Sequence, residues 1–272
     1  MHEAQGWIGR TREQQDEITR PALRRIAALL DRDTEFPTGS PIPPHWYAMF
    51  FPEIVPQSQI GEDGHPRRGD FLPPVALPRR MFAGRRMRFL APLRVGDTAT
   101  KHSEIVAITP KRGRSGEMVF VTIRHTVAVA GVPVITDEQD VVYREAATPG
   151  TPPPEPTPAP ADPAWSEQFV PSTTLLFRYS AITYNSHRIH YDADYVRGTE
   201  GYPGLVVNGG LTLLLLLEAA IRKLGRTPRG VAVRNIRPLY CGDTVTLAGA
   251  ATAAWAADGN GALAVSAELE IE

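Results

Sequence analysis

This sequence of 272 residues has little cysteine, almost no net charge and no apolar run long enough for a membrane span. Its single cysteine, Cys241, excludes an internal disulfide and suits a reducing compartment. The net charge of −1 gives no reason to expect nucleic acid or an anionic membrane as a partner. The segment Leu205–Ala220 is shorter than the ~20 apolar residues that cross a bilayer, and the N-terminal residues do not resemble a signal peptide. We therefore expect a soluble, cytoplasmic protein.

A proline-rich segment divides the chain into two halves. Residues 148–164 read TPGTPPPEPTPAPADPA. Proline removes backbone donors and favours extended polyproline II, so this segment does not fit in a packed core. The composition predicts a linker between a first domain at 1–147 and a second at 165–272.

The first half is expected to begin with a helix and continue in antiparallel strands. Thr11 and Gln14 have the spacing of a capping box, which predicts an amphipathic helix to about Asp31. His45–Phe51 is expected to form a turn or short helix. Pro56–Pro78 is rich in glycine and proline, and a loop of this length is uncommon unless it lines a site. Alternating apolar residues predict strands at Thr100–Thr109, Val119–Ala130 and Val134–Arg144.

The second half is expected to repeat this order. We predict a strand or loop at Ser172–Phe177, a short helix at Tyr179–Tyr184 and a nearly all-apolar helix at Leu205–Ala220. Strands are expected at Val231–Leu239, Thr244–Trp255 and Ala262–Ile271. The sequence Asp-Gly-Asn-Gly at 258–261 predicts a hairpin between the last two strands.

An internal repeat supports two similar domains. Arg88–Thr98, RFLAPLRVGDT, aligns without gaps on Arg234–Thr244, RNIRPLYCGDT, and six of the eleven positions are identical. Each copy precedes a predicted strand. A shared turn sequence could arise by chance, but duplication explains the matches better.

Polar residues with reactive side chains are concentrated in Arg178–Asp192, RYSAITYNSHRIHYD. The apolar helix follows soon after, which predicts reactive groups facing a water-poor cleft. Asn185 and His190 would lie about 140° apart on an uninterrupted helix, so they converge only if the helix ends near Asn185. Asparagine also tolerates the left-handed conformation of helix ends, so Asn185 as a simple C-cap is the alternative.

The stretches FRYSAITYNSHRIHYD and YPGLVVNGG, followed by the leucine-rich helix, resemble the MaoC-like hydratases (hydratase 2 family). More narrowly, they resemble the branch with mitochondrial 3-hydroxyacyl-thioester dehydratase type 2 and the bacterial mesaconyl-C4-CoA and itaconyl-CoA hydratases. GRRMRFLAPLRVGDT resembles the N-terminal domain of the same proteins. The resemblance implies an α+β double hotdog fold, with two antiparallel sheets each wrapped around a central helix. It also implies an acyl-CoA substrate and a homodimer. The first half contains no cluster like NSHRIH, so we expect it to be non-catalytic. No Gly-rich nucleotide motif, serine elbow or CxxC indicates a cofactor, so we expect none.

The resemblance assigns site residues by position. Asn185 stands where the wider family has aspartate, His187 where it has asparagine, and His190 where it has histidine. Asparagine at the first position also occurs in the narrower branch. The resemblance therefore implies His190 as the catalytic histidine, with Asn185 holding the water or the ring.

The start of the leucine helix is a second expected part of the site. Many relatives have His-Gly there, and this chain has Asn208-Gly209-Gly210. Free amides at a helix N-terminus favour a developing oxyanion, so this segment and His187 are candidates for oxyanion or substrate binding. Close packing of the helix is the alternative for the glycines.

Two further interpretations concern charged residues and metal. Arg85, Arg86 and Arg88 are candidates for binding CoA phosphates or a substrate carboxylate, or they form a solvated surface. His187 and His190 have the spacing of metal ligands, but no cysteine pair or distant acidic-histidine motif accompanies them. We therefore expect no metal.

The sequence thus predicts a hydro-lyase that reversibly adds water to an α,β-unsaturated acyl-CoA. Itaconyl-CoA or mesaconyl-C4-CoA is the expected substrate, giving a citramalyl- or malyl-type CoA. The alternatives are a 3-hydroxyacyl-thioester dehydratase of fatty acyl chains, a hotdog thioesterase and a non-catalytic acyl-CoA binding module. A thioesterase needs a carboxylate near the helix head, where Asn208 is not acidic and Glu218 lies too far along.

Overall fold

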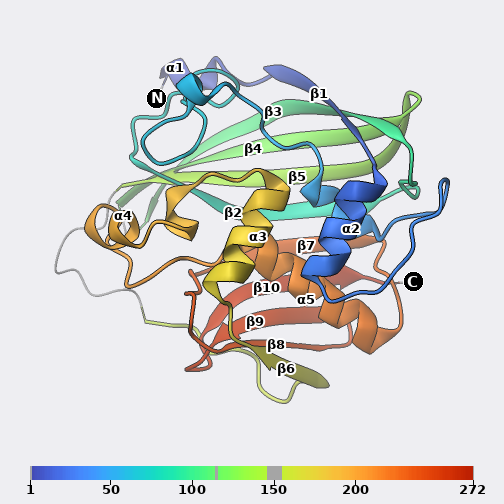
Figure 1. Cartoon of the computed structure of the whole chain (residues 1–272). Coiled ribbons are helices and arrows are strands. Elements are labelled where there is room, and N and C mark those ends of the chain that lie inside the picture. Colours follow the sequence, from blue (N-terminus) through green and yellow to red (C-terminus); the bar gives the residue numbers. More distant parts are fainter. Residues whose placement is uncertain (1, 114–115, 146–154, 272) are drawn as a thin grey trace.

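A computed structural model describes residues 2–113, 116–145 and 155–271. Within them, ten antiparallel strands form one sheet, in the order β1-β3-β4-β5-β2-β7-β10-β9-β8-β6 (Figure 1). The strands are β1 (Thr11–Glu17), β2 (Arg79–Phe89), β3 (Thr98–Gly113), β4 (Gly116–Val129), β5 (Val132–Arg144), β6 (Trp165–Phe169), β7 (Gly230–Asn235), β8 (Val245–Ala250), β9 (Ala253–Asp258) and β10 (Leu263–Glu270).

The longer helices lie together on one face of this sheet (Figure 1). The α-helices are α1 (His2–Gln5), α2 (Arg20–Leu29), α3 (Thr173–Thr183), α4 (Ala193–Gly198) and α5 (Gly209–Leu224). Three 3-10 helices are η1 (Pro44–Met49), η2 (Gln57–Gln59) and η3 (Arg188–His190). None of the helices in the described ranges is long and apolar enough to cross a membrane.

The two halves meet in the middle of the sheet, where β2 pairs with β7. The pairing runs from Gly84 opposite Arg234 to Arg88 opposite Gly230. A Cβ on Gly84 would lie 2.4 Å from the Val233 carbonyl oxygen, so glycine permits this close approach. The repeated segments begin at the ends of these two central strands, and each leads into the next strand of its own half. The sequence repeat therefore corresponds to a repeat in the structure.

The core lies between the sheet and the helices. Helix α5 is apolar on most sides, and Leu211, Leu216, Ala219 and Ala220 are fully buried. The small side chains of β8 to β10 allow the sheet to approach this helix closely, because alanine leaves room for leucine side chains from the other layer. The expected all-apolar central helix is confirmed, although it begins at Gly209 rather than Leu205.

The predicted first helix is wrong in its first part. Thr11–Glu17 forms strand β1, which pairs with β3 from Thr11 opposite Glu104 to Glu17 opposite Thr98. Tertiary pairing outweighs the local capping signal, and the charged residues of this segment suit the edge of a sheet. The helix α2 starts only at Arg20. The short helix expected at 45–51 is present as η1.

Two predictions for the second half also need correction. The segment expected as a strand or loop at 172–177 is the first part of α3, which Ser172 caps by accepting a hydrogen bond from the Leu175 amide at 3.2 Å. The single strand expected at 244–255 is two strands, β8 and β9. The turn between them places Ala251 at φ 48° without a glycine or proline to signal it. The hairpin at 258–261 joins β9 to β10 as expected.

The proline-rich linker lies partly outside the described residues, which exclude 146–154. Its last part lies along the second half, where the Leu263 amide donates to the Thr157 carbonyl at 2.8 Å and Pro158 forms an isolated bridge with Ala262.

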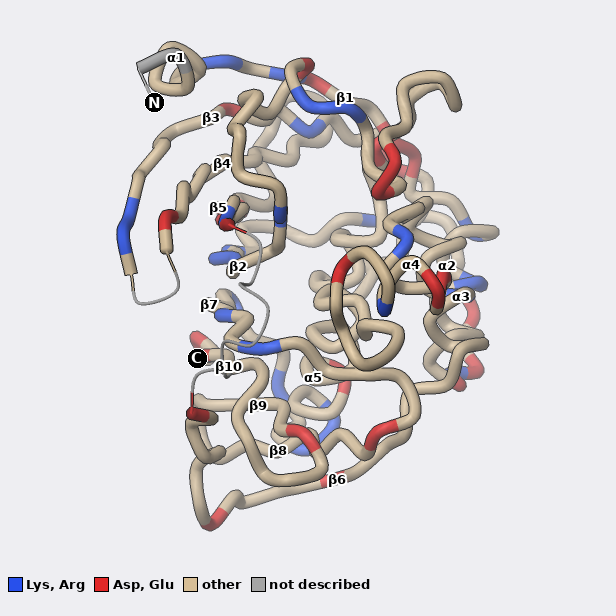
Figure 2. The backbone as a smooth tube through the Cα atoms, turned by 90° about the vertical axis from the view of Figure 1, so that its left-hand side faces the viewer, with Lys and Arg blue, Asp and Glu red and all other residues tan. Residues whose placement is uncertain are grey.

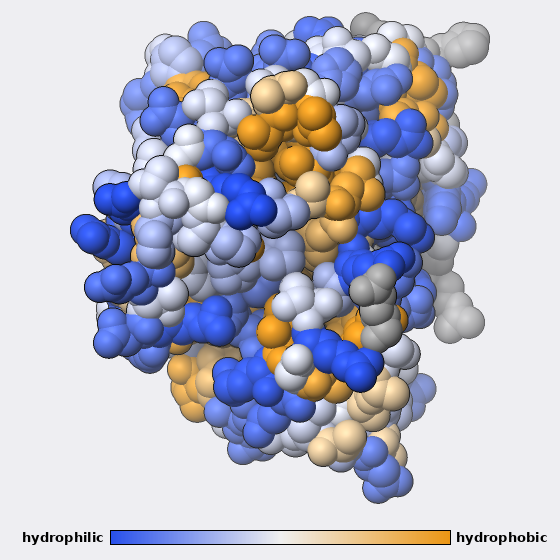
Figure 3. Space-filling view, turned by 90° about the vertical axis from the view of Figure 1, so that its right-hand side faces the viewer, coloured by the Kyte–Doolittle hydropathy of each residue, from blue (hydrophilic) through white to orange (hydrophobic). Residues whose placement is uncertain are grey.

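Acidic and basic residues are mixed along the backbone (Figure 2). On the face in Figure 3 apolar surface forms patches between hydrophilic residues.

Candidate active site

The end of helix α3 directs the polar segment 185–192. Tyr184 adopts the left-handed conformation at φ 53°, and the Asn185 amide donates to the Ser180 carbonyl at 2.8 Å. The helix therefore ends immediately before Asn185, as the convergence of Asn185 and His190 requires. The interpretation of Asn185 as the left-handed cap is wrong, because Tyr184 occupies that position.

The Asn185 side chain is held by its own backbone. Its Oδ1 accepts a hydrogen bond from the His187 amide at 3.0 Å, which is the geometry of an Asx turn. Within the described chain, no partner binds its Nδ2 group. One lone pair of the amide oxygen is used in this turn, whereas both Nδ2 donors of Asn185 remain for a bound molecule.

His190 lies in η3 and is 7 % exposed. Its Nδ1 is 2.7 Å from the Val206 carbonyl oxygen, which only accepts, so Nδ1 carries the proton and Nε2 keeps its lone pair. Burial lowers the pKa of His190 to about 4, although the hydrogen bond to Val206 raises it. His190 is therefore a neutral base of fixed tautomer at physiological pH.

The residues next to His190 in the sequence make different kinds of contact. His187 contacts His190 edge-on, with ring centroids 5.4 Å apart, and burial lowers the pKa of His187 to about 2. Arg188 forms an ion pair with Asp192 at 2.7 Å, and Asp192 caps helix α4 by accepting from the Tyr195 amide at 2.9 Å. Through these contacts Arg188 and Asp192 hold the backbone around His190.

A loop of the first half reaches this site, which the sequence did not specify. Ser186 Oγ donates to the Gly64 carbonyl at 2.5 Å, and the Arg188 amide donates to the Asp63 carbonyl at 2.9 Å. The His65 ring packs against His187 in a tilted arrangement, with centroids 3.9 Å apart. Gly64 has φ +85°, and a Cβ there would lie 1.9 Å from the Ser186 carbonyl oxygen. The length of the loop at 56–78 was the only signal in the sequence.

The loop contact also creates a group of possible metal ligands. Ligand atoms of Asp63, His65 and His187 lie within 4.8 Å of one another. Asp63 Oδ2 and His65 Nδ1 are 3.1 Å apart and serve as each other's partners. This group differs from the His187 and His190 pair considered in the sequence, and the absence of metal stays an expectation.

The start of α5 lies next to His190, because Val206 holds the His190 ring and the helix begins at Gly209. Asn208 is 2 % exposed, and its Nδ2 donates to Ser180 Oγ at 3.3 Å. Its Oδ1 is buried and has no hydrogen-bond partner among the described residues. The amides of the first helical turn have no partner within the helix. This end of α5 can therefore both donate to and accept from a bound molecule.

Gly210 is also required for packing. A Cβ on Gly210 would lie 2.2 Å from the Tyr179 hydroxyl of α3, whereas a Cβ on Gly209 would make an ordinary contact of 3.4 Å with Phe82. Gly210 therefore allows α5 to pack closely against α3. The role of both amides in binding an oxyanion stays a prediction.

The three candidate arginines do not come together. Arg85 points inward and forms an ion pair with Asp137 at 2.7 Å, while its side chain is 14 % exposed. Arg86 is on the other face of β2 and pairs with Asp140 at 2.6 Å. Arg88 is 68 % exposed at its side chain and pairs with Glu270 at 3.4 Å. Only Arg85 is placed near the helices.

Glu218 is the buried carboxylate of α5, and it already has partners. Its Oε1 is 2.7 Å from His45 Nε2 and accepts from Trp46 Nε1 at 2.7 Å, and Arg32 lies 3.3 Å from Oε2. Glu218 thus anchors η1 to the central helix.

Comparisons with known proteins support this description. The family model for hydroxyacyl-thioester dehydratase type 2 matches residues 45–241. Mesaconyl-C(4)-CoA hydratase from Chloroflexus aurantiacus is 46% identical over 238 residues, which cover 86% of this chain and 84% of the relative.

Solved structures show the same fold at low sequence identity. A MaoC-like dehydratase from Phytophthora capsici superposes with a TM-score of 0.67 and 15% identity, over 99% of this chain and 98% of the other. A Mycobacterium tuberculosis protein with a double hotdog fold gives a TM-score of 0.60 and 15% identity, over 97% and 96%. The expected α+β double hotdog fold is confirmed. The chain therefore belongs to the hydroxyacyl-thioester dehydratase type 2 family of MaoC-like proteins.

Proposed function

We propose that this protein is a hydro-lyase that reversibly adds water to an α,β-unsaturated acyl-CoA, with a small branched dicarboxylic acyl group as substrate. The observation that carries the proposal is the neutral His190, with Nδ1 fixed by Val206 and Nε2 available. Asn185, five residues earlier in the same polar segment, is held by its Asx turn with its Nδ2 donors unpaired among the described residues. The relative named mesaconyl-C(4)-CoA hydratase supports the choice of acyl group.

The reaction needs a base for water, a proton for the α-carbon and donors for the thioester oxygen. His190 Nε2 takes a proton from a water molecule whose oxygen forms the new bond to the β-carbon. Asn185 Nδ2 orients that water by donating to its oxygen. The π electrons of the double bond move to the thioester oxygen, and the imidazolium of His190 then gives its proton to the α-carbon.

The start of α5 suits the charge that develops on the thioester oxygen. The free amides at Gly209 and Gly210, together with the helix dipole, favour a negative oxygen at this position. The amides belong to a buried, rigid helix, so they need little reorganisation during the reaction. The buried Oδ1 of Asn208 is available to accept a hydrogen bond from the same ligand.

A spectrophotometric assay tests the proposal directly. Mesaconyl-C4-CoA should lose its enoyl-thioester absorbance when the protein is added, and a long-chain enoyl-CoA should react much more slowly. The alternative, a dehydratase of fatty hydroxyacyl thioesters, is favoured by the name of the family model. Faster turnover of the long-chain substrate would establish that alternative.

Release of free CoA separates hydration from thioester hydrolysis. A thioesterase would liberate thiol, whereas a hydratase leaves the thioester intact. Glu218 is held by His45, Trp46 and Arg32, which argues against a role as the nucleophile or base of a thioesterase. A binding module without activity would change neither absorbance nor thiol content.

Three related expectations belong to this proposal. The reaction as written needs no cofactor besides the CoA of the substrate, which full activity after exhaustive treatment with a chelator would check. A homodimer is expected from the resemblance, and light scattering in solution measures it. Cytoplasmic localisation is checked by cell fractionation.

A further inference from the structure

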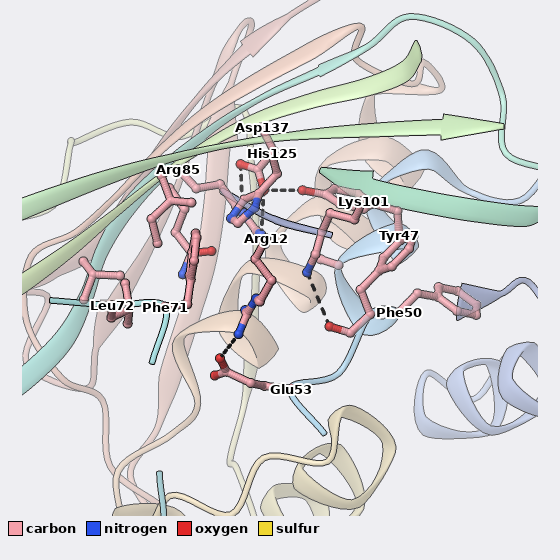
Figure 4. Close-up of a pocket in the computed structure, with 15 residues that line it drawn as sticks. Arg12, Tyr47, Phe50, Glu53, Phe71, Leu72, Arg85, Lys101, His125 and Asp137 are labelled. Carbon is pink, nitrogen blue, oxygen red and sulfur yellow. Dashed lines mark hydrogen bonds and ion pairs between the residues drawn. The ribbon is translucent and has the colours of Figure 1, made fainter. Parts of the chain in front are cut away.

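A cavity of about 240 Å³ lies in the first half of the molecule, on the side of the sheet that faces the helices (Figure 4). Aromatic and aliphatic side chains form part of its wall, among them Phe50, Phe71 and Ile123. Cationic side chains from three strands form another part, namely Arg12, Arg85 and Lys101. A small, partly apolar cavity with several cations suits an organic anion.

The charges around this cavity do not balance. Arg85 pairs with Asp137 at 2.7 Å, and Arg12 pairs with Glu53 at 2.7 Å. Among the described residues, no carboxylate lies within ion-pair distance of Lys101. Its Nζ donates only to the Phe51 carbonyl, at 3.4 Å, and lies 5.2 Å from the centre of the Phe51 ring. The lining therefore carries one positive charge in excess.

An incompletely paired ammonium group inside a protein is costly to keep charged. Burial, together with the positive charges of Arg12 and Arg85, lowers the pKa of Lys101 to about 8. Lys101 is thus still mostly protonated at neutral pH, with donor capacity left. The neighbouring His125 adds no charge, because burial lowers its pKa to about 4.

A second, smaller cavity lies between this one and the start of α5. Arg85 and Ala48 line both this cavity and a smaller one that extends to Tyr179 and Gly210. Gly210 is in the first turn of α5, where the proposed mechanism places the thioester oxygen. An acyl group bound there can therefore extend towards Arg85 and Lys101.

We propose that this cavity receives the acyl group and that Lys101, assisted by Arg12, binds the carboxylate at its distal end. This inference rests on the proposed hydratase function and assigns the selection of dicarboxylic acyl groups to the first half of the chain. The chemistry is a carboxylate that provides the missing counter-charge for Lys101 while its carbon chain contacts the aromatic wall.

Binding measurements without turnover test this assignment. The two ligands are methylsuccinyl-CoA and isovaleryl-CoA, whose saturated acyl groups have a similar shape. Only methylsuccinyl-CoA carries a carboxylate, which lies at the end of the acyl group remote from the thioester. The unchanged protein should bind the acidic ligand at least tenfold more tightly in isothermal titration. Lys101→Met should weaken binding of the acidic ligand about ten- to hundredfold. It should change the affinity for the neutral ligand by less than about twofold. Lys101→Arg should keep the preference.

The matched control is Lys111→Met. Lys111 lies on the same strand but is exposed and contacts Phe120 outside the cavity. This variant should bind both ligands like the unchanged protein. A preference that persists in Lys101→Met, or that Lys111→Met also loses, would overturn the assignment of Lys101.

Thermal unfolding gives a second, independent readout. Because methionine removes a poorly paired buried charge, Lys101→Met should melt at the same temperature as the unchanged protein or higher. If this variant is unstable, Lys101→Gln takes its place in the same titration. A Lys101→Gln protein that still binds the acidic ligand more tightly than the neutral one contradicts the proposal. Failure of hydration by the unchanged protein would instead reject the proposed function, so the two failures are distinguishable.

The titration of Lys101 predicts a specific alkaline effect. The charged and titratable groups that face Lys101 are Arg12, Arg85, His125, Glu53 and Asp137. Since Lys101 is protonated below a pKa of about 8, kcat/KM for a dicarboxylic enoyl-CoA should fall above pH 8. The fall should be absent in Lys101→Arg. The same fall in that variant would show that another group is responsible.

Discussion

The ring of His65 packs against the ring of His187, with the centroids 3.9 Å apart and the planes tilted by 40°, so a loop of the first half forms part of the candidate site of the second. The His187 amide in turn donates to Asn185 Oδ1, which orients the Asn185 side chain. His65 itself bonds to Asp63, and burial lowers its pKa while this bond raises it. His65 is therefore placed to position the segment that carries Asn185.

Replacing His65 measures this positioning. His65→Ala should lower kcat by about ten- to hundredfold, because small displacements of catalytic groups have effects of this size. His65→Phe keeps a ring against His187 and should restore most of the rate. His102→Ala is the control, since His102 is exposed on β3. If a folded His65→Ala protein loses all activity and Phe restores none, the expectation of a non-catalytic first half is wrong.

The pH profile tests the state of His190. Its catalytic form is neutral, and burial lowers its pKa to about 4. The rate kcat/KM should therefore stay level from pH 7 down to about pH 5 and decline only near pH 4. An acidic limb near the ordinary value of about 6.5 would contradict the buried environment.

Acid also weakens the fold itself, which the assay must separate from catalysis. The unfolded chain binds a proton at His190 below pH ~6.5, whereas the folded chain does so only near pH 4. The free energy of unfolding therefore falls as the pH is lowered from about 6.5 to about 4. Brief exposure to each pH, followed by an assay at pH 7, identifies irreversible loss of activity.

Replacing His190 tests its role in proton transfer. His190→Gln, assayed at pH 7, should lower the rate by about 10²–10⁴ if His190 moves the proton.

The fold was largely predictable because it depends on repeated apolar patterns. The strands β3, β4 and β5 and the hairpin after β9 follow from alternation and turn residues. The failures have identifiable causes. The segment 11–17 contains helix signals but becomes an edge strand through pairing with β3, and Ala251 forms a turn with no glycine or proline beside it.

The candidate site was predictable only where its residues are adjacent in sequence. Asn185 and His190 could be proposed from the sequence because they belong to one short polar segment that resembles the family motif. Asp63 and His65 reach the site through tertiary contacts of a loop, and no periodic pattern reports such contacts. The excess charge at Lys101 was equally hidden, because it depends on which carboxylates pair with Arg12 and Arg85.

Glu218 should be important for stability and not for chemistry. Glu218→Gln keeps the shape but removes the charge that His45, Trp46 and Arg32 contact. Losing charged hydrogen bonds in a buried site should lower the free energy of unfolding by about 2–4 kcal/mol. Chemical denaturation measures this change, and kcat of the folded fraction should stay within about threefold. A large loss of kcat in fully folded protein would return the thioesterase interpretation to consideration.

The Asx turn of Asn185 makes its replacement by aspartate the sharpest test of the mechanism. An aspartate can still accept from the His187 amide, so the local backbone should be preserved. It cannot donate when ionised, and the donor group is what the structure leaves free for water. Asn185→Asp should therefore reduce kcat by about ten- to hundredfold, the effect of one lost hydrogen bond of about 1–3 kcal/mol.

Two companion variants decide how the loss arises. Asn185→Ser keeps an acceptor for the His187 amide and regains a donor hydroxyl, so it should be more active than Asn185→Asp. Asn185→Ala removes both functions and should be the least active of the three. If aspartate equals or exceeds asparagine in kcat, the side chain acts as an acceptor or base, and the assignment of Nδ2 as the group that orients water is wrong. If alanine leaves the kinetics unchanged, Asn185 has no part in the reaction, and His190 must orient water with another partner.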